Sequence, residues 1–218
     1  ALADTDPTYA EQVGQMNHYW GGQRMSGGAF YFGVVMLVFF ILGLLFVKDA
    51  LRWPFLALSI LVLYLASNQM NAFNDFFIHQ FPMYNKFRDS KMLLVLWQIM
   101  VPTMGLLFLD KLVRNEGLLG QKKYWYGAMG GLLLIAVVLV ASPSLSGSFM
   151  TSEELKQFAD ASKQAKDASQ TAFYQGMRQA VIDARITIYK ADMQRSLFLV
   201  ILALGVVVLF LRTQMNRM

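Results

Sequence analysis

The loop between residues 68 and 91 carries the side chains best suited to chemistry in this chain. Polar and charged groups alternate there with aromatic rings, and they include Asn74, Asp75, Tyr84, Lys86 and Arg88. Aromatic rings can hold the apolar or sugar part of an amphiphile, while lysine and arginine can hold phosphate. The pattern therefore favours a site for a phosphate-bearing lipid. A plain interfacial loop, with rings and cations at headgroup level, is the alternative that composition leaves open.

No other chemistry is indicated by residue type or spacing. The chain contains no cysteine, which excludes disulfides, thiolate metal sites and cysteine nucleophiles. His18 and His79 are 61 residues apart and do not have the spacing of metal ligands. No nucleophile and base can be paired, so the sequence identifies no catalytic residue, no metal site and no cofactor.

Five apolar runs in the sequence predict the helices that would position this loop. The chain has 218 residues, of which 56% are hydrophobic and 15% charged, whereas a soluble domain usually carries about 25% charge. The runs cover residues 29–47, 53–66, 92–109, 124–141 and 197–211. The first would extend roughly 28 Å as a helix, close to the ~30 Å of hydrocarbon in a bilayer. The second is short, so it is either a tilted span or a helix buried among others. We therefore expect an all-α, polytopic transmembrane bundle of about five spans.

Basic residues in the short loops predict the orientation. Lys48 and Arg52 follow the first run, and four more basic residues lie in residues 110–123, so these loops are assigned to the cytoplasm. Alternation makes residues 1–28 an outer loop, 29–141 four spans, 142–195 an extracytoplasmic segment, and 196–218 the final span with a cytoplasmic end. The excess of 19 basic over 14 acidic residues then reflects membrane lipids as partners rather than nucleic acid.

Residues 142–195 are predicted to form helices outside the bilayer, between the fourth and fifth spans. Thr151 and Glu154 match a capping box at the start of the first helix. Apolar residues then recur at helical spacing up to the last span. Because one straight helix of about 45 residues would extend nearly 70 Å, the segment must fold back. We expect a helical hairpin, or one upright helix and one on the surface, with Gly176 either a hinge or a glycine tolerated within a helix.

The ends of the chain suggest a piece of a longer polypeptide. It begins at Ala1 without a methionine and without the features of a signal peptide, and it stops soon after an apolar run. A processed mature protein is the alternative.

Three stretches resemble one known family. They are residues 19–33 (YWGGQRMSGGAFYFG), residues 74–88 (NDFFIHQFPMYNKFR) and residues 191–197 (ADMQRSL). These stretches resemble the YfhO family of bacterial multi-pass membrane proteins, in particular its Bacteroidetes members. Lys91 departs from the small or hydroxyl residue that the family pattern has before Met92.

The resemblance implies both a function and a location. YfhO proteins are longer and are grouped with GT-C type glycosyltransferases, so the chain would be the C-terminal-side part of such an enzyme in the bacterial cytoplasmic (inner) membrane. These enzymes transfer sugar from a polyprenyl-phosphate carrier to a cell-envelope acceptor on the outer face. The resemblance thus implies a lipid-linked sugar donor, and the remainder of the polypeptide as a partner, with the catalytic acid in a loop outside this chain. The alternative functions are a transporter or flippase of lipid-linked sugars and a non-catalytic membrane scaffold.

Overall fold

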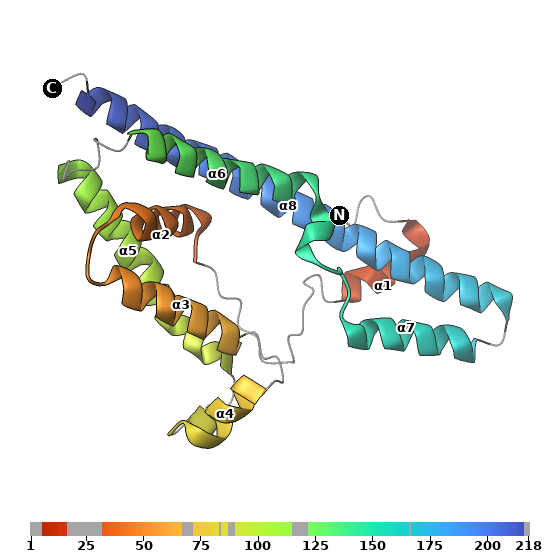
Figure 1. Cartoon of the computed structure of the whole chain (residues 1–218). Coiled ribbons are helices and arrows are strands. Elements are labelled where there is room, and N and C mark those ends of the chain that lie inside the picture. Colours follow the sequence, from red (N-terminus) through yellow and green to blue (C-terminus); the bar gives the residue numbers. More distant parts are fainter. Residues whose placement is uncertain are drawn as a thin grey trace. The chain divides into compact units, whose positions relative to one another are not determined.

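The chain is helical throughout the part that its computed structural model describes, which comprises residues 6–16, 32–66, 72–82, 84–86, 90–114, 122–165 and 167–215. No strand occurs in these residues, and the predicted all-α class is confirmed. The elements in order are α1 (Pro7–Gln15), α2 (Val34–Phe46), α3 (Arg52–Ala66), α4 (Ala72–Gln80), η2 (Tyr84–Lys86), η3 (Ser90–Leu93), α5 (Leu94–Arg114), α6 (Lys122–Ala141), η5 (Pro143–Ser146), α7 (Ser152–Gln164) and α8 (Ala168–Met215) (Figure 1).

Three of these helices are long and apolar enough to cross a membrane, which indicates a membrane protein. These helical segments are Lys91–Arg114, Tyr124–Ala141 and Ala168–Thr213; each includes an apolar window of 18 residues, and they contain the third, fourth and fifth predicted spans. Pro102 lies inside α5, and the helix continues through it, as a spanning helix can when neighbouring groups satisfy the freed backbone.

The first two predicted spans form shorter helices. Residues 32–33 precede α2, which has only 13 residues and would extend about 20 Å, less than the ~30 Å of bilayer hydrocarbon. Helix α3 has 15 residues, or about 22 Å. The sequence predicts a helix over residues 29–47. Within the described residues 32–47 it is shorter than expected, because it begins only after Gly33, whose φ of 74° is non-helical.

The chain divides into two compact units. Unit 1 comprises Ala1–Met25 and Leu133–Phe198, and unit 2 comprises Ser26–Leu132 and Leu199–Met218. Each has its own buried cluster. In unit 2, α2 packs on α5 around Phe40, Val101 and Met104.

Close packing in unit 2 depends on a glycine. A Cβ placed on Gly43 would lie 2.9 Å from both the Cγ and the carbonyl oxygen of Met104, so a larger residue would force α2 and α5 apart. At the end of α2, the ring of Phe46 stacks on Trp125 of α6 at 4.1 Å between centroids. Unit 2 is therefore held together by apolar surfaces in contact.

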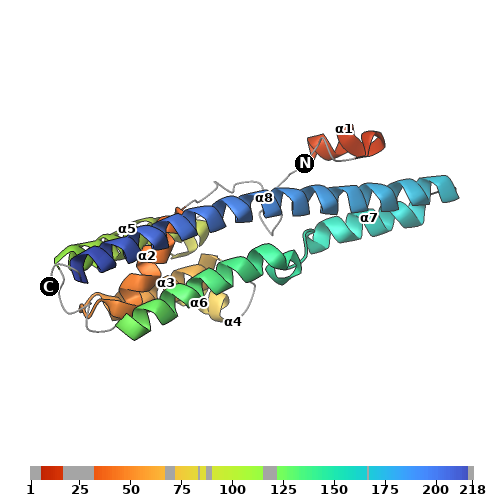
Figure 2. The ribbon, with the colours of Figure 1, turned by 90° about the horizontal axis from the view of Figure 1, so that it is seen from above.

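In unit 1, α7 and the first part of α8 lie side by side, with α1 packed against the same core (Figure 2). The core residues are Val13, Met150, Val181 and Ala184. The predicted capping box is confirmed: the hydroxyl of Thr151 accepts from the Glu154 amide, and the Glu154 carboxylate accepts from the Thr151 amide.

Of the two predictions for Gly176, the hinge is wrong and the glycine within a helix is confirmed. Gly176 lies inside α8, which is one unbroken helix of 48 residues, and the chain reverses instead after α7 ends at Gln164 and before α8 begins at Ala168. The glycine has a packing role. A Cβ on Gly176 would overlap the phenol of Tyr9 from α1, with the ring Cζ at 2.8 Å.

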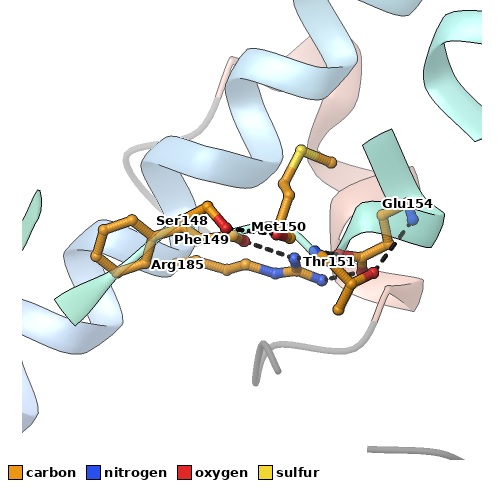
Figure 3. A network of polar contacts seen from close by, with 6 residues as sticks. All are labelled: Ser148, Phe149, Met150, Thr151, Glu154 and Arg185. Carbon is orange, nitrogen blue, oxygen red and sulfur yellow. Dashed lines mark hydrogen bonds and ion pairs between the residues drawn. The ribbon is translucent and has the colours of Figure 1, made fainter. Parts of the chain in front are cut away.

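A buried arginine on α8 forms an ion pair with a glutamate on α7 (Figure 3). The side chain of Arg185 is 2% exposed, and it donates to the two carboxylate oxygens of Glu154 at 2.6 and 2.9 Å and to the carbonyl of Phe149 at 2.8 Å. The hydrogen bond from Arg185, helped by the amide of Thr151, lowers the pKa of Glu154 from 4.5 to about 2. One carboxylate thus both caps α7 and holds α8.

Candidate functional site

The described part of the predicted lipid-carrier loop, residues 68–91, comprises α4, the two residues after it, η2 and the first two residues of η3, all in unit 2. Helix α4 carries Asp75 in its first turn, where a carboxylate complements the positive end of the helix dipole, and His79 in its last turn. Tyr84 to Lys86 form one turn of 3-10 helix beside it, since α4 and η2 are in contact. Residues 67–71, Met83 and residues 87–89 lie outside the described part of the chain.

An aromatic cluster dominates this region. Phe77 lies at its centre, with ring centroids 5.0 to 5.9 Å from those of Phe73, Phe76, Phe81 and Tyr84. Phe73 also meets Tyr64 at the end of α3, edge to face at 5.1 Å. The cluster is therefore connected to an apolar helix at one end.

Much of this aromatic surface is exposed. Phe73 is 42% exposed, Phe76 56% and Phe81 54%. A soluble protein would normally bury such rings, and a contiguous exposed apolar patch marks a partner or a lipid. Rings at this position can contact acyl or prenyl chains.

Four of the five predicted polar residues are described, and they are divided between interior and surface. Asn74 is 6% exposed and Tyr84 9% exposed, and burial raises the pKa of the Tyr84 hydroxyl. Asp75 and Lys86 are exposed. Arg88, the predicted phosphate-binding fork, lies outside the described residues. The structure thus brings Tyr84 to the aromatic cluster and leaves Lys86, two residues later, at the surface.

A metal site is not formed by the described residues. Within those ranges, no three His, Asp or Glu side chains are grouped as potential ligands. Asp75 and His79 share one face of α4 by their spacing of four. Two potential ligands do not make a site.

Comparison with known proteins gives no relative. The chain matches no protein-family model, no curated protein and no solved structure. Function must therefore be argued from the residues and their geometry.

The residue that sequence reasoning missed is Arg185. It forms the buried network with Glu154 and Phe149, and the pattern contained a signal for it. The apolar residues Phe173, Met177, Val181 and Ile188 make a helical stripe whose next position after Val181 is 185. A cation on a buried stripe needs an anionic partner, and Glu154 supplies it. Its role in the structure is to join helices.

Proposed function

We propose that the chain is part of a YfhO-like membrane glycosyltransferase, and that α4 and η2 contact the lipid carrier of the sugar. The observation that carries the proposal is that α4, with its exposed rings, contacts η2, which carries the exposed Lys86. The rings suit a polyprenyl chain and the cation suits its phosphate. Arg88, two residues further along the sequence, would add a planar fork for two phosphate oxygens.

The proposed topology has five crossings of the bacterial cytoplasmic membrane, with α2 and α3 as short ones. Ile60 and Leu63 on α3 are 63% and 43% exposed, as expected of side chains that face lipid. Short apolar helices can cross where the bilayer thins and flanking cations reach the headgroups. Lys48, between α2 and α3, and Arg52, the first residue of α3, could serve in this way.

The hairpin of α7 and the first part of α8 is proposed to lie outside the bilayer, on the outer face. It has a charged surface, with exposed Lys156, Asp160 and Lys163 on α7. The packing of α1 into its core supports one common side for residues 1–28 and 142–195. The final span would then be the part of α8 that follows residue 196.

The runner-up functions differ in what they require inside the spans. An ion-coupled transporter keeps ionisable groups within its spans, yet residues 92–109, 124–141 and 197–211 contain no Asp, Glu, Lys, Arg or His. This favours an enzyme, or a scaffold that binds no carrier. Binding of the lipid carrier would distinguish the enzyme from the scaffold.

The test is photocrosslinking with polyprenyl monophosphate. The whole chain is reconstituted in phosphatidylcholine nanodiscs with a benzophenone-bearing polyprenyl phosphate, and labelled peptides are mapped after irradiation. We expect labelling within residues 72–86, removed by competing polyprenyl phosphate but not by polyprenol. The double substitution Phe76→Ala/Phe81→Ala, and separately Lys86→Ala, should each lower labelling several-fold.

Phe198→Ala is the matched control, because Phe198 is an aromatic ring on α8 that is 64% exposed. It should leave labelling of α4 unchanged. Equal labelling of all variants, or equal competition by polyprenol, would show that the loop only anchors the chain in the interface. Sugar transfer by the full-length polypeptide, with Arg88→Lys compared with Arg88→Ala, then tests the enzymatic part.

A further inference from the structure

A second basic region of unit 2 lies at the other end of α3 from α4, where α2 and α3 are joined (Figure 1). The connection forms an open hollow of about 390 Å³ lined by Lys48, Asp49, Ala50, Arg52 and Trp53. Helix α3 separates this hollow from the aromatic cluster by about 22 Å. The two regions are therefore distinct.

The hollow has a net positive charge. Lys48 and Arg52 contribute two cations and Asp49 one anion. One oxygen of the Asp49 carboxylate already accepts from the backbone amide of Leu51 at 3.0 Å, which turns it toward the chain. Within the described residues, neither Lys48 nor Arg52 forms an ion pair with a carboxylate. Both cations are thus available to an anion from outside.

The rim of the hollow is apolar. The guanidinium of Arg52 lies over the indole of Trp53, 4.6 Å from the ring centroid, and Trp53 is 63% exposed. Leu45 and Leu51, which are close to these residues in the sequence, are 55% and 43% exposed. A free phosphate ion would not contact these apolar side chains, whereas a lipid would place its acyl chains on them and its headgroup on the cations.

We propose that this hollow binds the phosphate of an anionic membrane lipid at the junction of α2 and α3. Arg52 lies over the indole face and would offer its planar guanidinium to two phosphate oxygens, and Lys48 would add a point charge. The bound lipid would hold the ends of two helices that are each too short to cross the hydrocarbon alone. This site is independent of the carrier site proposed on α4.

The test is a titration of the purified whole chain, in neutral detergent, with dioctanoyl phosphatidylglycerol, with bound lipid counted by native mass spectrometry. The double substitution Lys48→Gln/Arg52→Gln should weaken binding by about tenfold or more, because two charge-assisted contacts are lost. Asp49→Asn keeps the acceptor for the Leu51 amide and removes the anion, so it should tighten binding. Trp53→Ala should weaken binding by roughly threefold through loss of the cation–π contact.

The matched control is Lys111→Gln/Arg212→Gln, which removes two cations near the ends of α5 and α8. It should change the affinity less than twofold. Thermal melting of each variant verifies that it is folded. Equal losses in the two double variants would mean that the lipid meets cations anywhere on the chain, and the proposal fails. Displacement of the lipid by 10 mM inorganic phosphate, or equal affinity for dioctanoyl phosphatidylcholine, would also overturn it.

Discussion

The two units of this chain are stabilised by different interactions. Unit 1 combines amphipathic helices with a capping box and a nearly fully buried arginine paired with a carboxylate. In unit 2, α2 and α5 pack through apolar side chains, with Gly43 against Met104 at the closest point. Water can solvate the exposed charges of α7 in unit 1, whereas α3 and α5 of unit 2 expose apolar side chains such as Ile60 and Ile99.

The difference reflects the surroundings in which each kind of interaction can provide stability. In water, burial of apolar surface drives packing, and a buried ion pair chiefly fixes which helices meet. Between helices surrounded by lipid that driving force is absent, so close contact of surfaces must hold them together. Charge changes should therefore disturb unit 1, and changes of side-chain volume should disturb unit 2.

The largest expected effect comes from Glu154→Gln in unit 1. The one amide oxygen of glutamine can still accept from the Thr151 amide, as capping boxes allow. Its NH2 group then replaces the oxygen that accepts from Arg185, so the negative charge and one acceptor are removed. The buried guanidinium of Arg185 would then face a neutral group, and we expect unit 1 to lose about 3 kcal/mol of stability. Hydrogen exchange of the α7 amides in the solubilised whole chain measures this loss locally.

Asp160→Asn is the control for that substitution, because Asp160 is an exposed carboxylate on the same helix. It should change the opening free energy of α7 by less than about 0.5 kcal/mol. If the two variants exchange alike, the ion pair does not stabilise α7 and the contrast between the units is lost. The double variant Glu154→Gln/Arg185→Met should recover part of the stability, since neither charge is then buried alone.

Acid should have the next largest effect, and only on unit 1. The pKa of Glu154 is about 2 in the folded chain, against the ordinary value of 4.5 for the unfolded chain. The ionised carboxylate therefore stabilises the folded state fully above pH 4.5, and this stabilisation is lost as the pH falls toward 2. At pH 3 we expect α7 to have lost about 2 kcal/mol. Hydrogen exchange from pH 6 to pH 3, normalised to intrinsic rates, gives the curve. Glu154→Gln should abolish this component, and persistence of the full curve in that variant would assign it to other groups.

Gly43→Ala should disturb unit 2 by a smaller amount. The new methyl would meet the backbone carbonyl of Met104, which cannot move without moving α5. Overpacking of this kind typically costs 1–3 kcal/mol, and the better helix propensity of alanine offsets up to about 1 kcal/mol. The melting temperature of the solubilised chain should fall. Gly130→Ala on α6, where the methyl meets no atom within 4 Å, should leave it unchanged or raise it.

Local patterns in the sequence predicted much of this fold. The apolar runs marked the three long helices, and Thr151 with Glu154 marked the start of α7, because hydropathy and caps depend on neighbouring residues. The ends of α2 could not be predicted in this way, since uncharged residues before Gly33 read as a continuation of the span. The pairing of Arg185 with Glu154 joins residues 31 apart, a distance at which periodicity carries no information.

The candidate site was predictable in type but not in arrangement. Composition drew attention to the rings of α4, and it could not separate the interior Asn74 and Tyr84 from the exposed Asp75 and Lys86. That division depends on which face of α4 and η2 turns inward. Gly176 shows the same limit, because a hinge and a close contact both favour glycine, and only the position of Tyr9 distinguishes them.

Gly176→Ala is the smallest expected effect, and it tests that distinction. In contrast to Gly43, the new methyl would meet the tip of a side chain, the phenol of Tyr9, which can swing aside. We expect α8 to stay unbroken and α1 to lose protection against hydrogen exchange. The net change should stay within about 1 kcal/mol, because alanine favours the helix. In a Tyr9→Ala background the overlap disappears, so the same substitution should stabilise the chain by up to about 1 kcal/mol. A hinge would respond to alanine equally in both backgrounds, and that result would contradict a packing role for this glycine.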